Sequence, residues 1–249
     1  MSRSLWYAHG YSCRLTDKLR DNREAVSAFD DHVSLSPWLR ELDAAQQERV
    51  HRDLFERELC AGAFVCRKGD AVEHWIGVVR GIVKVSNVSS SGKPVTLTGI
   101  AAGGWFGEGS LLKDEPRKYD VVALRDSRIA YLPRATFQWL LDTSIAFNRH
   151  LLQQLNERLG QFIGTVEIDR LLGPDARVAR CLAQLFNPLL YPGVGTRLEI
   201  AQSEIGFLTG LSRQTVNRAL QRLERDGFLQ VEYGALTVVS LDGLRHFDG

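Results

Sequence analysis

The chain has 249 residues, of which 44% are hydrophobic, and 31 lysines and arginines against 30 aspartates and glutamates. This composition is globular, so it excludes disorder, collagen and coiled coil as descriptions of the whole chain. Because the net charge is only +1, a nucleic-acid partner would have to be indicated by a local feature rather than by a global basic field.

The cysteine content and the apolar segments indicate the compartment. Four cysteines without a C-x-x-C pair are too few for a disulfide scaffold and favour a reducing environment. The N-terminus lacks the apolar core of a secretory signal, and no apolar run approaches the roughly 18 residues of a membrane span. We therefore expect a cytoplasmic protein with no membrane partner.

The first half of the chain changes from a polar segment to helical and then to β-type patterns. Residues 1–33 are polar and are expected to form an N-terminal extension, and the apolar spacing of Pro37–Leu59 predicts one or two short helices. Short β-type runs then alternate with glycine-containing turns, at Ala63–Asp70, Trp75–Gly81, Ile82–Ser86, Val95–Ile100, Val121–Leu124 and Arg128–Pro133, with a hairpin tip at 89–93. Many short strands are typical of a sandwich or jelly roll, so residues 34–143 are expected to form a β-roll.

Helical periodicity returns from Ala135 to Leu172. Within it, apolar residues are spaced by 3, 4, 3 and 4 positions at Leu152, Leu155, Leu159, Phe162 and Val166. This is the a/d pattern of a coiled coil, which predicts a long dimerisation helix over 144–172. An ordinary amphipathic helix packed on its own β-roll would carry a similar stripe, so that alternative stays open. Gly173-Pro174 then ends the helix and starts another, because proline is tolerated only in a first turn.

The C-terminal segment, residues 173–249, carries the strongest signal. Ile205 and Leu208 give a first helix an inward face, Gly210 provides a tight turn, and Ser212 can cap a second helix. A two-stranded hairpin turning near Gly234 follows. A helix-turn-helix followed by such a hairpin is a winged module.

The outward positions of the second helix suit the reading of base pairs. In helix-turn-helix proteins the second helix enters the major groove, where arginine can bond to guanine and glutamine or asparagine to adenine. Residues 212–226 contain four arginines and only two acidic residues, Glu224 and Asp226. The expected DNA-binding residues are Ser212, Arg213, Gln214, Asn217, Arg218 and Arg222. A helical hairpin with a solvated Arg/Gln face is the alternative interpretation.

With these motifs in place, the chain resembles the CRP/FNR family of bacterial transcription regulators from about Leu59 to Leu241. Gly210–Arg218, read as Gly-Leu-Ser-Arg-Gln-Thr-Val-Asn-Arg, is very similar to the family's recognition-helix motif. Gly69-Asp70, Gly81, Gly92 and the Gly104-Trp-Phe-Gly-Glu-Gly run match the glycines of its β-roll. The resemblance implies an α+β fold: an N-terminal β-roll similar to a cyclic-nucleotide-binding domain, a long dimerisation helix and a C-terminal winged helix-turn-helix.

The resemblance also implies the partners. The family pattern is a homodimer, paired through the long helix, that binds a two-fold symmetric operator on double-stranded DNA, with RNA polymerase as a further candidate partner. By matching positions, Arg213, Gln214 and Arg218 would read the bases. The cAMP-binding member has Glu where this chain has Gln214, so the operator sequence is expected to differ.

An effector in the β-roll is implied as well, but its identity is unknown. In cAMP-binding relatives the Gly-Glu of a Phe-Gly-Glu element contacts the ribose, which maps onto Gly107 and Glu108, and an arginine followed by a small hydroxyl residue holds the phosphate. Arg117 fits that arginine if the loop is one residue shorter, but Lys118 stands where the hydroxyl should be. The adenine-binding hydroxyls become Phe162 and Ile163, which cannot accept or donate such bonds. These mismatches make cAMP doubtful and favour another small molecule near Gly107, Glu108, Arg117, Lys118 and Phe162.

The sequence gives less support to other cofactors and other functions. Cys13 stands alone and Cys60 and Cys66 offer only two thiolates, so no iron–sulfur cluster is expected. Haem ligation by His9, His51 or His74 stays open. A cupin-like metalloenzyme would need several histidines in the β-roll, where only His74 lies, so no metal site, catalytic residue or enzyme activity is expected. The remaining alternative is a cyclic-nucleotide-binding protein that regulates protein partners.

Overall fold

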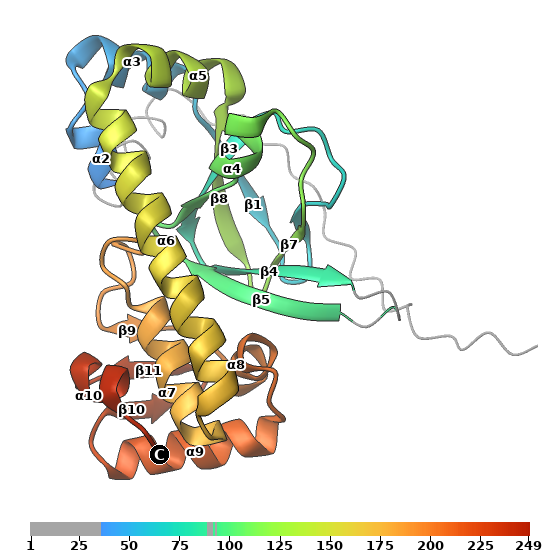
Figure 1. The fold of residues 1–249 in the computed structure, drawn as a ribbon, viewed down its shortest axis with the longest axis vertical. Coiled ribbons are helices and arrows are strands. Elements are labelled where there is room, and N and C mark those ends of the chain that lie inside the picture. Colours follow the sequence, from blue (N-terminus) through green and yellow to red (C-terminus); the bar gives the residue numbers. More distant parts are fainter. Residues whose placement is uncertain (1–35, 89–91, 93) are drawn as a thin grey trace, which may run out of the picture.

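The computed structural model describes residues 36–88, 92 and 94–249. The expected N-terminal extension with its boundary at residue 33, and most of the expected hairpin tip at 89–93, lie outside these residues. Two four-stranded sheets form a β-roll, a long helix runs beside it, and a small helical module with a three-stranded sheet follows (Figure 1). The expected fold class is thereby confirmed.

Antiparallel strands build the two sheets of the β-roll. The first sheet has the order β1 (Phe55–Leu59), β8 (Ser127–Pro133), β3 (His74–Arg80) and β6 (Trp105–Phe106). The second has the order β2 (Phe64–Cys66), β7 (Asp120–Ala123), β4 (Ile82–Val88) and β5 (Pro94–Ala101). Ile76 pairs with both Tyr131 and Phe106, which places the end of β6 beside the centre of the first sheet. The chain therefore enters the Phe106-Gly107-Glu108 segment directly from the sheet.

The segment Pro37–Leu59 contains the expected short helices and also a strand that was not expected. Helices α2 (Pro37–Arg40) and α3 (Ala44–Asp53) are present, and Asp43 caps α3 by accepting from the Gln46 N–H at 2.9 Å. Phe55–Leu59 is instead the strand β1, which pairs with β8. No glycine or proline separates α3 from β1, so nothing in the local sequence marks the change, and pairing with β8 decides it.

A cluster of aromatic rings fills the space between the first sheet and the helices at one end of the β-roll. These helices are α2, α3 and α5 (Arg134–Thr143), together with the first turns of α6 (Ile145–Leu171). The cluster consists of Trp38, Trp75, Trp105, Phe137 and Phe147, all at most 4% exposed. The rings of Trp75 and Trp105 lie 4.5 Å apart between centroids. Burial of several large rings stabilises this end of the domain and fixes Trp75 and Trp105 beside the Gly107 segment.

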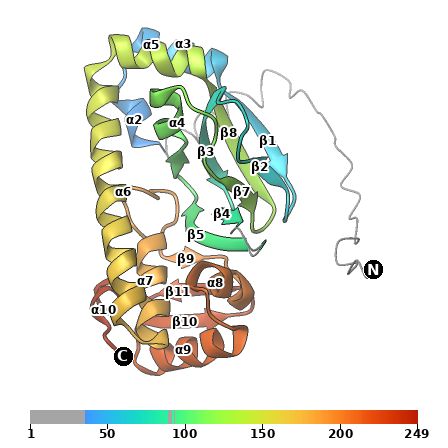
Figure 2. The same ribbon diagram turned by 45° about the vertical axis from the view of Figure 1, so that its right-hand side comes forward.

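Helix α6 extends along one side of the whole molecule, from α5 at one end to the C-terminal module at the other (Figure 2). It begins at Ile145, where the hydroxyl of Ser144 accepts from the Phe147 N–H at 3.3 Å. It ends at Leu171, and Pro174 occupies the first turn of α7 (Pro174–Leu185) as expected. The separation of α5 from α6 at Ser144 follows from its extended backbone.

The C-terminal module contains the expected helices and hairpin. Helices α8 (Gln202–Thr209) and α9 (Arg213–Arg225) are followed by strands β10 (Leu229–Glu232) and β11 (Ala235–Val238), which turn at Gly234. A two-residue strand β9 (Arg197–Leu198) and helix α10 (Leu241–His246), neither of which the sequence indicated, complete it. No helix among the described residues is long and apolar enough to cross a membrane.

Candidate nucleic-acid interface and effector site

The start of α9 is fixed by a capping serine and a turn glycine. The Ser212 hydroxyl accepts from the Thr215 backbone N–H at 3.2 Å, which satisfies one of the donors that the first turn leaves open. Gly210 ends α8 with φ of +69°, a conformation that favours glycine. The inward side of α9 is buried through Val216, Ala219, Leu220 and Leu223. One side of α9 is therefore buried in the module, and the opposite side is exposed.

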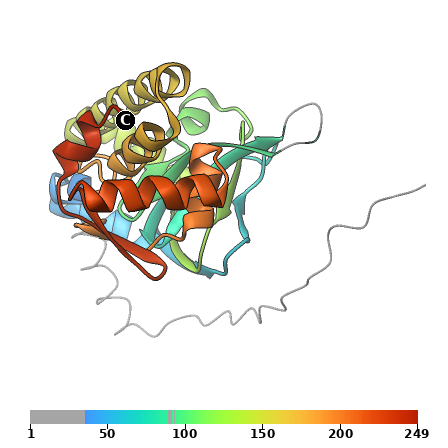
Figure 3. The same cartoon turned by 90° about the horizontal axis from the view of Figure 1, so that it is seen from below.

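Three of the expected DNA-binding side chains lie on that exposed side. Arg213, Gln214 and Arg218 are exposed, and within the described part of the chain no hydrogen bond or ion pair engages them. Seen from below, α9 lies across the surface of the molecule with its length open to the viewer (Figure 3). Unengaged guanidinium and amide groups near the start of a helix are placed as a major-groove reader requires.

Two other expected readers are engaged within the protein. The Asn217 Oδ1 accepts from Gln202 Nε2 at 2.9 Å, which links α9 to the start of α8. The Arg222 guanidinium forms an ion pair with Asp175 of α7, with 3.2 Å between Nη1 and Oδ2. Both side chains are half-buried. Local partners within the module therefore hold both side chains, and the expectation that they bind DNA stays a prediction.

The tip of the hairpin carries an exposed aromatic residue that the sequence analysis missed. Tyr233 lies between β10 and β11 and its exposed fraction is 107%. Beside it, Glu232 is held by Arg197 of β9, with 3.0 Å between Oε2 and Nη2. The signal that could have found Tyr233 is its place directly before Gly234, since the residues at a hairpin turn are the most exposed.

The expected effector site begins where β6 ends. Gly107 has φ of +93°, and a side chain at this position would collide with the Arg117 guanidinium. Glu108 opens α4 (Glu108–Lys113) and is only 4% exposed. Its carboxylate lies 3.4 Å from Trp75 Nε1 and 3.6 Å from Arg158 Nε. A buried carboxylate is thus matched by an arginine and an indole N–H.

Arg117 lies at the same place but its guanidinium is already engaged. It is 4% exposed, and Nη2 donates to the His74 carbonyl at 2.6 Å while Nη1 donates to the Gly107 carbonyl at 3.4 Å. These two bonds use two of the five guanidinium N–H groups, so the other three are the donors that an anion beside Arg117 could engage without displacing either carbonyl.

Helix α6 reaches the site through two residues that the sequence analysis missed. Gln154 Nε2 donates to the Trp105 carbonyl at 2.6 Å, and the Arg158 guanidinium donates to the same oxygen. Arg158 therefore joins both Trp105 and Glu108 to α6. The available signal was spacing, because Gln154, Arg158 and the expected Phe162 follow one another at intervals of four along one helix face.

Two of the expected effector residues do not lie in the site. Lys118 is exposed and pairs with Glu115 in the same loop, with 2.6 Å between Nζ and Oε2. Phe162 is 66% exposed on α6. The loop turns the Lys118 side chain outward toward Glu115, and its expected contact with an effector stays a prediction. Within one chain, Phe162 belongs to an open surface rather than to the surroundings of Glu108.

Two tyrosines enclose the site instead. Burial raises the pKa of Tyr119, and the nearby Glu108 carboxylate raises it further. Tyr191, from the segment after α7, is fully buried against the β-roll, where its hydroxyl donates to the Gly99 carbonyl at 3.1 Å. Burial raises the pKa of Tyr191 as well. Both phenols are neutral at physiological pH and can act as hydrogen-bond donors or acceptors.

Among the described residues, the side chains that could bind a metal do not lie close enough together to form a site. No group of three or more His, Cys, Asp or Glu side chains suited to a metal exists among the described residues. His74 packs edge-on against the stacked rings of Phe55 and Tyr131, at 5.3 and 5.7 Å between centroids. Burial raises the pKa of the Cys66 thiol to about 11, which disfavours the thiolate that a cluster requires. His9 and Cys13 lie outside the described residues.

The expected dimer seam is largely open to solvent. Large apolar side chains lie exposed along α6, and we call this set the α6 strip: Ile145, Leu152, Leu159, Phe162 and Ile163, each at least 57% exposed. The other two expected seam residues, Leu155 and Val166, are half-buried against the protein's own chain. Ile145, Leu152 and Leu159 follow one another at intervals of seven, so they line one face of the helix.

The β-roll and the C-terminal module meet in a polar and apolar junction. Arg125, in the turn between β7 and β8, pairs with Glu204 of α8, with 3.0 Å between Nη2 and Oε2, and with Glu199 at 3.4 Å. The Lys84 ammonium of β4 lies 4.6 Å from the ring centroid of Phe207 on α8. The Tyr191 bond to β5 belongs to the same junction. The first helix of the helix-turn-helix is thus docked on the effector domain.

Comparisons with known proteins agree with both halves of this arrangement. Residues 56–144 match the family model of the cyclic nucleotide-binding domain, and residues 176–247 match that of the Crp-like helix-turn-helix domain. The chain is 30% identical over 185 residues to the cyclic AMP receptor protein of Thermus thermophilus, covering 74% of this chain and 84% of that protein.

Further relatives share the same organisation. The HTH-type transcriptional regulator Cmr of Mycobacterium tuberculosis is 28% identical over 205 residues, which cover 79% of this chain and 80% of Cmr. Among solved structures, FixK2 from Bradyrhizobium japonicum shares the fold with a TM-score of 0.64 at 20% identity, covering 79% of this chain and 98% of that chain.

Proposed function

Because the chain belongs to the CRP/FNR family of transcription regulators, we propose that it acts as a homodimer that inserts the α9 helix of each protomer into the major groove of a two-fold symmetric operator. The family membership establishes that the protein is a DNA-binding transcription regulator rather than an enzyme. The assignment of Arg213, Gln214 and Arg218 as base readers rests on one observation: these three exposed side chains lie unengaged on one side of a capped helix.

The α6 strip supports the homodimer. Exposed leucine, isoleucine and phenylalanine side chains on one helix face are unfavourable in water and are buried when two copies of the helix pack together. Parallel pairing along α6 would bring two C-terminal modules to the same end of the dimer, because each module follows the C-terminal end of α6. Such a dimer matches operator half-sites about one helical turn apart.

The effector is proposed to be a small molecule other than cAMP that acts beside Glu108. The position of a hydroxyl residue next to Arg117 is taken by Lys118, which pairs with Glu115, and Phe162 has no polar atom for an adenine amine. Glu108 is joined through Arg158 to α6, and the junction with α8 lies beyond it. A ligand that displaces the Arg158 bonds more readily in one packing of α6 than in another would shift the orientation of the C-terminal modules.

The comparisons decide between the alternative functions, and the other expectations stay predictions. The match to a Crp-like helix-turn-helix over residues 176–247 decides against a cupin-like metalloenzyme and against a regulator that acts only on protein partners. Contact with RNA polymerase, the domain boundaries near 33, 143 and 172, and a cytoplasmic location stay predictions.

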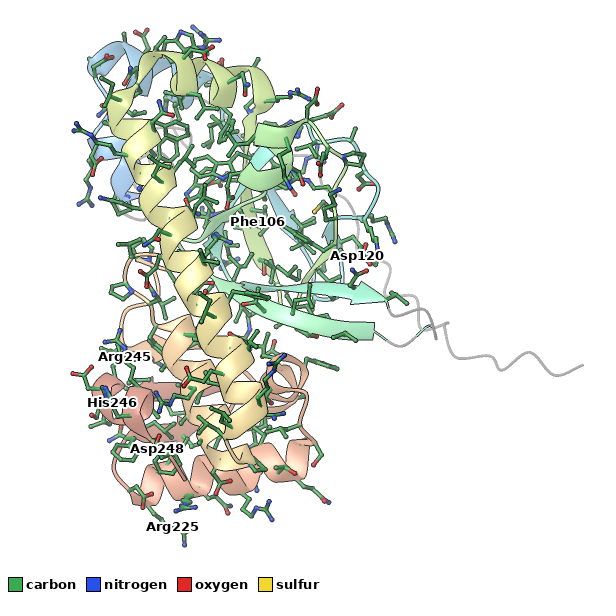
Figure 4. The ribbon with its side chains drawn as sticks, in the orientation of Figure 1. Phe106, Asp120, Arg225, Arg245, His246 and Asp248 are labelled. Carbon is green, nitrogen blue, oxygen red and sulfur yellow. The ribbon has the colours of Figure 1, made fainter. Side chains whose placement is uncertain are left out.

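The test of the base readers is a gel-shift titration. A duplex is first selected from a randomised pool with the wild-type protein, and binding is then compared for Arg213→Ala, Arg218→Ala and the control Arg225→Ala. Arg225 lies at the end of α9 and points away from the body of the protein (Figure 4). Each reader substitution is expected to weaken binding by about 10- to 100-fold for each half-site, because a bidentate base contact contributes roughly 1–3 kcal/mol. If neither reader substitution weakens binding more than the control, the assignment fails.

The test of the effector is calorimetric titration of the purified protein with cAMP. No saturable binding at micromolar concentrations is expected, since the buried hydrogen-bond partners of the phosphate and the adenine are missing. Saturable micromolar binding of cAMP would overturn this part of the proposal.

A further inference from the structure

Arg222 is an arginine of the recognition helix whose guanidinium is engaged by residues of its own protein. Its guanidinium lies 3.2 Å from Asp175 Oδ2 and 3.9 Å from Asp226 Oδ2. It also lies 5.4 Å from the centroid of the Phe247 ring, near the end of the chain. The Asp175 side chain is only 20% exposed, whereas that of Arg222 is 41% exposed. Arg222 is thus held by three neighbours from three different segments.

The place of Asp175 gives this ion pair its significance. Asp175 is the second residue of α7, and only Leu172 and Gly173 separate α7 from the end of α6. The ion pair therefore joins α9 to the point where the chain leaves α6. In Figures 1 and 2, α9 passes close to the lower end of α6 and the start of α7. A contact at this point joins the recognition helix to the segment that directly follows α6.

Electrostatics make the same pair relevant to DNA binding. Asp175 and Asp226 place two carboxylates beside the helix that the proposed function inserts into DNA. Arg222 lies against both and offsets their charge. A planar guanidinium can engage two carboxylates and an aromatic face together, whereas a lysine ammonium is a single point charge. Arg222 is suited to hold this arrangement and is not free to reach a base.

We propose that Arg222 is a positioning residue, which fixes the angle between α9 and the end of α6 through Asp175 and does not itself contact DNA. This proposal rests on the proposed function, since it concerns the orientation of the same recognition helix. It divides the arginines of α9 into readers, Arg213 and Arg218, and an anchor, Arg222.

The test compares operator affinity and its salt dependence for Arg222→Gln, Asp175→Asn and the double variant, with Arg225→Gln as the matched control. The probe is the duplex selected from a randomised pool with the wild-type protein. Arg225 lies on the same helix and no ion pair engages it within the described chain. Its loss therefore measures the effect of removing one positive charge without the anchor.

The proposal predicts, for each variant, whether operator affinity falls or rises. Arg222→Gln is expected to weaken binding by about two- to fivefold for each half-site, the usual range for a partly exposed ion pair. The slope of log affinity against log salt is expected to equal that of Arg225→Gln. Asp175→Asn, although it removes a negative charge near DNA, is also expected to weaken binding in the wild-type background. In the Arg222→Gln background the same substitution is expected to strengthen binding, because an unneutralised carboxylate is removed.

Two results would overturn the proposal. If Arg222 contacts a phosphate, its substitution lowers the salt slope by about 0.9 for each protomer, beyond the effect of Arg225→Gln. If the pair has no positioning role, Asp175→Asn strengthens binding in both backgrounds. Thermal unfolding monitored by circular dichroism shows whether each variant is folded, and Arg222→Lys provides a milder variant if Arg222→Gln does not fold. Loss of binding by Arg213→Ala in the same assay tests the proposed function separately.

Discussion

The α6 strip predicts that the affinity between two protomers depends on individual leucines of α6. Leu152 and Leu159 are 67% and 57% exposed in the single chain. Full burial of a leucine side chain contributes about 1.5–3 kcal/mol, so burying the exposed part of Leu159 contributes about 1 kcal/mol. Because two-fold symmetry repeats each substitution, Leu159→Ala should cost the dimer about 2 kcal/mol, and the double substitution Leu152→Ala/Leu159→Ala about 4 kcal/mol.

These free energies correspond to an increase in the dimer dissociation constant of about 30-fold for Leu159→Ala and about 1,000-fold for the double variant. Sedimentation velocity over a range of protein concentrations measures the constant directly. Leu112→Ala, on α4, is the matched control, because Leu112 is 45% exposed but lies away from α6. The folded state of each variant should be unaffected, since the leucines are already exposed.

Two outcomes would refute this reasoning. The wild-type protein would sediment as a single protomer at every concentration, or Leu159→Ala would dissociate no more readily than Leu112→Ala. Either result would mean that the α6 strip is not the surface that joins two copies.

Three further predictions concern stability. Arg125→Gln should lower the free energy of unfolding by about 1–3 kcal/mol in chemical denaturation, because it leaves the buried Glu204 carboxylate without its partner. Arg197→Gln, in the exposed pair with Glu232, should change the free energy of unfolding by less than about 1 kcal/mol. Equal effects of the two substitutions would contradict the stabilising role of the Arg125–Glu204 ion pair. Gly107→Ala should destabilise the protein by about 2 kcal/mol or more, since φ is +93° and the Arg117 guanidinium occupies the space, and an unchanged midpoint would contradict this. Burial lowers the pKa of His150 from 6.5 to about 4, so the unfolded chain takes up a proton first as the pH falls below about 6.5. The resulting loss of stability, up to about 3 kcal/mol by pH 4, should be reduced in His150→Gln, and an identical pH dependence in both proteins would contradict it.

The parts of the fold that could be predicted from the sequence are those with a strong local signal. The turn glycine at 210, the capping serine at 212 and the apolar spacing of α9 determine the recognition helix locally. Proline at 174 likewise marks the start of α7. Strand β1 was missed because its identity depends on pairing with β8, more than 60 residues later, and not on its own residues.

In the candidate sites, too, local sequence patterns predict some side chains, and others depend on partners from distant elements. The exposure of Arg213 and Arg218 follows from helix periodicity, so the sequence was sufficient. The engagement of Arg222 by Asp175 depends on how α7 crosses α9, which no local pattern encodes. Similarly, Arg158 reaches Glu108 only because α6 lies against the β-roll in one particular register. Side chains whose partners come from distant elements are therefore the ones that sequence patterns leave undetermined.

The most direct test of the central claim is the spacing of the half-sites. A duplex selected with the wild-type protein is compared in a gel-shift titration with the same duplex carrying five additional base pairs between its half-sites. Two recognition helices fixed to one α6 pair require half-sites on the same face of the duplex, about 10 base pairs apart. Five extra base pairs place the second half-site on the opposite face, so binding is predicted to fall to the level of an unrelated duplex. Unchanged affinity for the lengthened duplex would contradict the claim that two α9 helices bind together.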